Sequence, residues 1–298
     1  ELAQTLEEQL ERSVDDRETY DLSLQLGEVY QYKLNEPAVA LEWIGRAFLQ
    51  RPDPSLEERL CDLAQGSNAW QNFAVLLSDA LSHPTCEPEM KLILHRRLAY
   101  LYNDILGEPS LAVPHLQEVA NESPWDEQTA RALREKLHGL EEWAALANRL
   151  EIDAGQTKDK EEKFHILLEL GNLYFDRLSQ AEDAVEVWYR ALKRRPEDKS
   201  ILVRLMDGFR ATEQWPDSIK VLKKLTALET DIERRAQYFH AIGVIQRDKL
   251  DDVTAAVRAF DQALEFNPGF FRAFQAIEEV LVDEGNFERM DRYYRKML

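Results

Sequence analysis

Large and small apolar residues recur along the chain with a constant spacing of 72 positions. The first copy comprises Leu26, Gly27, Tyr30, Leu34, Ala40, Ile44, Ala47 and Pro52. The second copy comprises Leu98, Ala99, Tyr102, Leu106, Ala112, Leu116, Val119 and Pro124. The third has Leu170, Gly171, Tyr174, Leu178, Ala184, Trp188, Ala191 and Pro196, and the fourth has Ile242, Gly243, Gln246, Leu250, Ala256, Phe260, Ala263 and Pro268. A repeat this regular indicates one supersecondary unit that is used several times.

Within each copy the spacing predicts two helices that cross closely. Gly27, Gly171 and Gly243 lie inside a helical apolar pattern, where glycine costs about 1 kcal/mol relative to alanine. A second helix that packs tightly at this point explains why that cost is accepted. The large residue four positions after the small residue of the second helix, such as Ile44 after Ala40, shares its face and fills the core. The proline that closes each copy then ends the second helix.

Four weaker copies lie between the clear ones. An aromatic residue marks the inter-helix turn of each, namely Trp70, Trp143, Trp215 and Phe287. Their first helices keep an apolar stripe at helical spacing, as in Leu202, Leu205 and Phe209. Where the clear copies have the small residue, the last three weaker copies have Arg134, Met206 and Glu278. Each 72-residue period therefore contains two helical hairpins, one regular and one degenerate.

The clear copies resemble the tetratricopeptide repeat, whose signature runs Leu-Gly, Tyr, Ala, Phe, Ala and Pro over about 34 residues. All four carry one extra residue in the inter-helix turn, near Leu34, so the resemblance is to a slightly lengthened variant. It implies an all-α, right-handed α-solenoid of about eight hairpins plus one leading helix, or about 17 helices. The composition agrees, because 11 Gly and 11 Pro among 298 residues leave few helix breakers.

We expect one solenoid over residues 1–298. The predicted hairpins span 18–52, 53–82, 89–122, 123–154, 160–195, 197–228, 231–266 and 269–298, and residues 1–13 form the second helix of an interrupted unit. Ser55-x-x-Glu58 and Thr230-x-x-Glu233 predict capping boxes. Because neither end has a polar capping helix, we expect a fragment of a longer array, or self-association through the uncapped ends.

Charge narrows the range of partners. The chain has 37 basic and 56 acidic residues, a net charge of −19, and this disfavours nucleic acid because phosphate binding needs a basic surface. No apolar run approaches the roughly 18 residues of a membrane span. Residues 1–82 hold 16 acidic and 6 basic residues, a net charge of −10. This excess predicts either a solubilising surface or an acidic surface that attracts a basic segment of a partner.

Catalytic motifs are missing from the sequence, which has no GxGxxG, P-loop, HExxH, GxSxG or CxxC. We therefore expect no catalytic residues, no cofactor and no metal. His83 and Cys86 supply only two of the four ligands of a structural zinc site. The 298 residues contain no signal-like segment, so the cytoplasm is the default expectation for the location.

The resemblance also implies where a partner binds, because the first helix of each hairpin lines the concave surface in this family. When the groove-facing positions of the family are counted from Gly27 and its equivalents, the predicted binding residues are Glu28, Arg96, Tyr100, Asn103, His165, Asn172, Phe175, Arg210, His240 and Arg247. Tyr100 and Phe175 either anchor a peptide or pack against neighbouring helices. Asn172 matches an asparagine that clamps peptides in relatives, but Leu168 occupies the column of the companion lysine. A clamp for heat-shock-protein tails is therefore not expected.

These observations predict a non-catalytic scaffold that binds a peptide or protein in its concave groove. Two other functions stay open at this point. The chain is alternatively a regulatory or sensor arm of a larger enzyme or signalling protein, or a self-assembling structural rod.

Overall fold

The computed structural model describes residues 1–84, 86–124, 126–283, 285 and 287–297. Across these residues the regular structure consists of 17 α-helices and two short π-helical turns, without a strand, and the all-α prediction is confirmed. The contacts cluster into two compact units, Glu1–Glu142 and Trp143–Leu298. We refer to them as unit 1 and unit 2 and describe each by itself.

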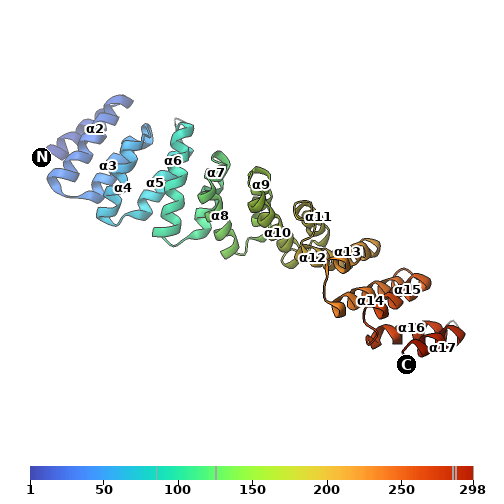
Figure 1. Cartoon of the computed structure of the whole chain (residues 1–298). Coiled ribbons are helices and arrows are strands. Elements are labelled where there is room, and N and C mark those ends of the chain that lie inside the picture. Colours follow the sequence, from blue (N-terminus) through green and yellow to red (C-terminus); the bar gives the residue numbers. More distant parts are fainter. Residues whose placement is uncertain (85, 125, 284, 286, 298) are drawn as a thin grey trace. The chain divides into compact units, whose positions relative to one another are not determined.

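Helices of each unit follow one another as hairpins in chain order (Figure 1). Unit 1 contains α1 (Leu2–Arg12), α2 (Asp16–Glu28), η1 (Val29–Leu34), α3 (Pro37–Gln50), α4 (Pro54–Ser67), α5 (Trp70–Ser82), α6 (Pro88–Tyr100), η2 (Leu101–Ile105), α7 (Pro109–Glu122) and α8 (Glu127–Gly139). Unit 2 contains α9 (Trp143–Gln156), α10 (Lys160–Asp176), α11 (Ala181–Leu192), α12 (Lys199–Ala211), α13 (Trp215–Leu228), α14 (Ile232–Asp248), α15 (Val253–Phe266), α16 (Phe271–Asp283) and α17 (Phe287–Met297).

Even-numbered helices are the first helices of the hairpins, and odd-numbered helices after α1 are the second helices. Within a unit, second helices such as α3, α7, α11, α13 and α15 pack against the first helix of their own hairpin and against that of the next hairpin. This arrangement buries the apolar stripe of the second helix on two sides. We call the surface formed by the even-numbered helices of a unit its first-helix face.

The extra residue of the regular hairpins is accommodated in the inter-helix turn. In all four, a backbone N–H donates to the carbonyl six residues earlier: Glu36 to Tyr30 at 2.9 Å, Glu108 to Tyr102 at 2.7 Å, Gln180 to Tyr174 at 2.8 Å and Asp252 to Gln246 at 2.9 Å. The residue before each donor is left-handed: Asn35, Gly107, Ser179 and Asp251, with φ between 53° and 70°. In the degenerate hairpins the corresponding backbone N–H donates to the carbonyl only five residues earlier, as Gln214 does to Phe209 at 2.9 Å.

Close helix crossing at the repeat glycines is confirmed. A Cβ added to Gly27 would lie 2.3 Å from Ile44 Cγ1, and one added to Gly243 would lie 2.4 Å from Phe260 Cε1. Both partners come from the second helix of the same hairpin and are fully buried. Only a residue without a side chain allows the two backbones to approach this closely.

The capping boxes predicted at Ser55 and Thr230 are wrong, because the N-cap residues are Asp53 and Asp231. Asp53 Oδ1 accepts from the backbone N–H groups of Ser55 and Leu56, at 2.8 and 3.1 Å. The starts of α4 and α14 are therefore each capped by a single carboxylate, which also interacts favourably with the helix dipole. The sequence pattern did not distinguish an aspartate at the cap from the hydroxyl residue beside it.

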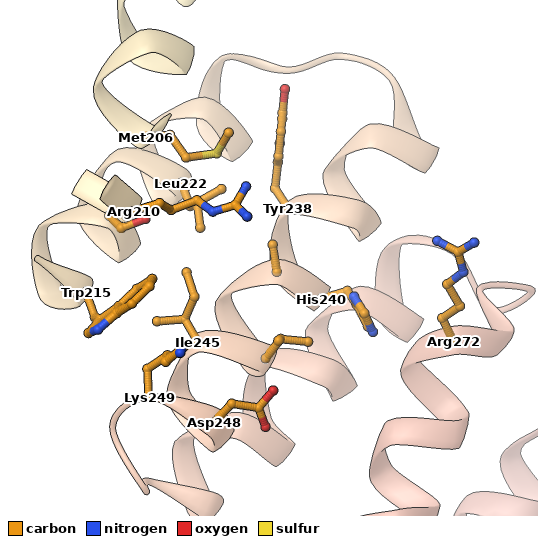
Figure 2. Close-up of a pocket in the computed structure, with 13 residues that line it drawn as sticks. Met206, Arg210, Trp215, Leu222, Tyr238, His240, Ile245, Asp248, Lys249 and Arg272 are labelled. Carbon is orange, nitrogen blue, oxygen red and sulfur yellow. The ribbon is translucent and has the colours of Figure 1, made fainter. Parts of the chain in front are cut away.

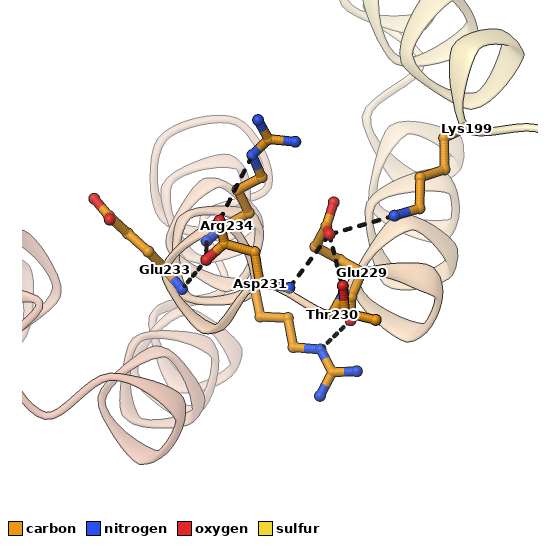
Figure 3. Close-up of polar contacts among 7 residues, drawn as sticks. Lys199, Glu229, Thr230, Asp231, Glu233 and Arg234 are labelled. Atoms are coloured by element: carbon orange, nitrogen blue, oxygen red, sulfur yellow. Dashed lines mark hydrogen bonds and ion pairs between the residues drawn. The ribbon is translucent and has the colours of Figure 1, made fainter.

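A buried carboxylate fixes the start of α14 (Figure 3). Glu229 Oε1 accepts from the backbone N–H groups of Thr230 and Asp231, at 2.9 and 3.3 Å, and lies 3.3 Å from Lys199 Nζ on α12. The two backbone hydrogen bonds and the lysine lower the pKa of Glu229. Arg235 on α14 donates in turn to the backbone oxygen of Glu229. The contacts therefore tie α14 to the end of α13 and to α12.

Candidate functional site

Three of the predicted binding residues line one cavity on the first-helix face of unit 1. Arg96 and Tyr100 on α6 and Asn103 on η2 border a space of about 220 Å³ whose opposite wall is α8. Tyr100 is 47% exposed, so its ring is not part of the core. Arg96 Nη2 lies 3.7 Å from the cap residue Asp126, which keeps this guanidinium beside the start of α8.

The opposite wall of this cavity was missed by sequence reasoning. It includes Thr129, Ala132 and Lys136 of α8, the first helix of a degenerate hairpin. Arg134 occupies the column of the small residue in that helix, and no groove-facing positions were counted from it. The spacing of Ala130, Leu133 and Leu137, which are all buried, is the signal that could have defined the register of that helix.

A larger cavity of about 730 Å³ lies on the first-helix face of unit 2 (Figure 2). Its apolar walls come from three consecutive helices: Met206 on α12, Trp215 and Leu222 on α13, and Ala241, Val244 and Ile245 on α14. Its polar residues are Arg210, Ser218, Tyr238, His240, Asp248, Lys249 and Arg272. Arg210 and His240 were predicted, whereas the others were not. The volume falls within the range of about 300–1,000 Å³ that is usual for ligand sites.

The charges around this cavity do not balance. Asp248 is its only carboxylate, and it is paired with Arg247, whose Nε lies 2.7 Å from Asp248 Oδ1. Arg210 and Arg272 are exposed, and neither forms an ion pair within the described part of the chain. Lys249 Nζ lies 5.1 Å from the centre of the Trp215 ring, a cation–π geometry. The mouth of the cavity is therefore positive, although the chain as a whole is strongly acidic.

His240 is half-buried between Phe260 and Phe270, with ring centroids 5.4 and 5.6 Å away. Burial, together with the positive charges of Arg272 and Arg247, lowers the pKa of His240. The imidazole is consequently neutral near pH 7 and adds no charge to the cavity. Its ring lies on the α16 side of the cavity, near Arg272 (Figure 2).

The remaining predicted residues differ in their surroundings. Glu28 and His165 are exposed on α2 and α10, as expected for groove-facing positions. Phe175 is half-buried and packs against Trp188, with ring centroids 5.5 Å apart, so it supports the core of its hairpin. Asn172 is also half-buried, and its Oδ1 has no hydrogen-bond partner among the described residues. Arg247 is held by Asp248 and by Glu279, whose Oε2 lies 3.1 Å from its Nη1.

In the described part of the chain, no three histidine, cysteine, aspartate or glutamate residues converge as metal ligands. None of its helices is long and apolar enough to cross a membrane.

The paired helices, the close crossings at glycine and the shared six-residue turn define a tetratricopeptide-type repeat fold. No known family profile matches the chain, and no curated protein matches it. Among solved structures, MamA is 19% identical over 55% of this chain and 92% of its own, with a TM-score of 0.39. YrrB, described as a tetratricopeptide repeat protein with an unusual peptide-binding site, is 14% identical over 68% of this chain and 97% of its own, with a TM-score of 0.38. A repeat protein from Cytophaga hutchinsonii is 14% identical over 85% and 98%, with a TM-score of 0.37.

Proposed function

We propose that this chain is a non-catalytic protein-interaction scaffold whose first-helix faces bind peptide or protein segments. The observation that carries the proposal is the cavity of about 730 Å³ in unit 2, which combines apolar walls with unpaired arginines. Aromatic residues and arginine dominate binding hot spots between proteins, and both types line this cavity. The backbone groups of the helices that form it are already hydrogen-bonded, so recognition depends on side chains.

Unit 1 offers a second and smaller site of the same kind. Arg96, Tyr100 and Lys136 place two cations and an exposed aromatic ring around its cavity, together with the carboxylate of Asp104 and with Asp126 beside Arg96. Further toward the N-terminus, Asp21 and Glu28 are exposed on α2, and they support a contact with a basic segment there. The two units thus present surfaces of different charge to a partner.

A matched pair of variants tests the proposal by affinity capture. One variant carries Lys136→Glu and Arg210→Glu on first helices, and the control carries Arg46→Glu and Arg258→Glu on the second helices α3 and α15. Both variants change the net charge equally. We expect wild type and control to capture the same proteins, and the first-helix variant to lose them.

Capture that survives in the first-helix variant, or that is lost equally in the control, would contradict the proposal. Circular dichroism of each variant is measured beforehand, so that a loss of folding is not read as a loss of binding. A wild-type chain that retains no protein at all would also count against a scaffold.

A further inference from the structure

We propose, on the basis of the scaffold function above, that the cavity of unit 2 binds a short acidic segment that carries a large apolar side chain. The apolar side chain enters between α12, α13 and α14. Carboxylates next to it in the segment pair with Arg210 on one side and Arg272 on the other. The shared chemistry is a carboxylate, whether from a side chain or from a chain terminus.

The apolar walls of the cavity match a large apolar side chain of the ligand. Met206, Leu222 and Ile245 lie together around one side of it, with the Trp215 ring at its edge (Figure 2). Each side chain projects from a helix, so the wall exists before a ligand arrives and costs little to order. Met206 adds an unbranched side chain that adapts to ligands of different shape.

One polar group in the wall is also without a partner. Ser218 is fully buried, and its Oγ forms no hydrogen bond with any described residue. A buried hydroxyl that lacks a partner is unfavourable by about 1–3 kcal/mol.

The charged residues around the cavity favour an acidic ligand. Arg210, Lys249 and Arg272 surround the cavity, while its single carboxylate is paired with Arg247, which also binds Glu279. In Figure 2 the guanidinium of Arg210 extends over the cavity, whereas Arg272 projects from the helix on the far side. Two exposed guanidinium groups at opposite edges match a ligand with carboxylates on both sides of its apolar residue.

A short acidic segment fits better than a long polyanion. The chain carries a net charge of −19, so a nucleic acid that extends beyond the cavity meets repulsion over most of the surface. A basic segment meets the uncompensated arginines and is repelled at the cavity itself. A short acidic and apolar segment avoids both penalties.

Defined synthetic peptides test the inference by fluorescence anisotropy. The probe is a labelled peptide with a central Leu-Phe pair flanked by two glutamates on each side, capped at both ends. Its relatives replace the glutamates by lysines, replace Leu-Phe by Ser-Ser, or leave the C-terminal carboxylate free. We expect the acidic probe to bind, and the lysine and serine versions to bind at least about tenfold more weakly.

Variants assign the binding to this cavity. Arg210→Glu and Arg272→Glu should each weaken binding of the acidic probe by about tenfold, more at low than at high ionic strength. Arg258→Glu, an exposed change on α15 of the same unit, should leave it within about twofold. Equal or tighter binding of the lysine version would overturn the inference, and so would an equal effect of Arg258→Glu. Tighter binding of the free-acid version, lost in the same variants, would assign the carboxylate to a chain terminus.

A peptide-library selection on the wild-type chain separates the two proposals. Enrichment of acidic peptides with one large apolar residue supports both. Enrichment of basic or uncharged peptides alone overturns the inference about this cavity and leaves the scaffold function standing. A library that yields no peptide, with no protein retained in the capture experiment, overturns both.

Discussion

Gly171→Ala places a single methyl group at the crossing of α10 and α11. An ideal Cβ at this position would lie 2.4 Å from Trp188 Nε1 and 2.5 Å from Trp188 Cδ1. Two effects oppose each other. Alanine is the better helix former by about 1 kcal/mol, whereas the added atom overlaps the indole ring. Which effect wins depends on whether the ring can move.

Trp188 has little room to move. It is fully buried, it contacts Phe175 on one side, and a Cβ at Gly208 of α12 would lie 3.2 Å from its Cζ3. Adding an atom to a core this close-packed costs about 3 kcal/mol at the upper end of the usual range. After subtraction of the propensity gain, we expect Gly171→Ala to reduce the free energy of unfolding by about 2 kcal/mol.

Gly155→Ala is the matched control in the same unit. Gly155 lies in the last turn of α9, is exposed, and has no atom within 4 Å of an added Cβ. Here only the higher helix propensity of alanine acts, so we expect the free energy of unfolding not to fall and to rise by up to about 1 kcal/mol.

Urea unfolding followed by circular dichroism measures both changes. The reasoning is refuted if Gly171→Ala is as stable as wild type or gains stability as Gly155→Ala does. Trp188→Leu supplies a further check, because removal of the ring should make Gly171→Ala much less harmful in a double-mutant cycle. Additive effects of the two changes would show that the methyl group and the ring do not interact.

Two further predictions concern polar pairs in unit 1. Glu57 is 2% exposed, and its Oε1 lies 2.5 Å from Arg97 Nε. Because Arg97→Met leaves this buried carboxylate without its partner, we expect the free energy of unfolding in urea to fall by about 3–5 kcal/mol. The fall should be smaller when Glu57→Gln is added, since the buried charge is then removed as well. His115 Nδ1 lies 3.0 Å from His95 Nδ1, and burial followed by the charge of His95 lowers the pKa of His115 to about 4. In the unfolded chain the pKa of this histidine is about 6.5, so on acidification the unfolded state binds the proton before the folded state does. The contribution of His115 to stability is therefore complete above about pH 7, and the free energy of unfolding falls by about 2 kcal/mol between about pH 7 and pH 5. His115→Gln should flatten this pH dependence of unfolding, and an unchanged slope would contradict the assignment.

Much of the fold followed from the sequence, because its main signals are local. A helix former such as alanine and a breaker such as proline act within one turn, so their recurrence every 72 residues predicts helices and boundaries directly. The close crossing was also predictable, since Gly27 and Gly171 are costly in a helix unless another backbone approaches. The extra residue of the turn was visible as a length difference, although its left-handed conformation was not.

The cavities required the tertiary structure. Each one joins residues from two or more hairpins, and the frame taken from Gly27 did not select Lys136, Trp215 or Arg272, which come from degenerate hairpins. Whether an arginine is paired with a carboxylate also depends on contacts between helices. Arg210 and Arg247 look alike in the sequence, but only Arg247 meets carboxylates on α14 and α16.

The sequence alone therefore determined the repeat, the helix content and the tight joint within each regular hairpin. The tertiary structure decided which side chains of neighbouring hairpins meet, which cations stay unpaired and where space is left between helices. The physical reason is the separation along the chain over which each effect acts. Helix formation depends on residues within a few positions of one another, whereas a binding surface depends on distances between helices that are far apart in the chain.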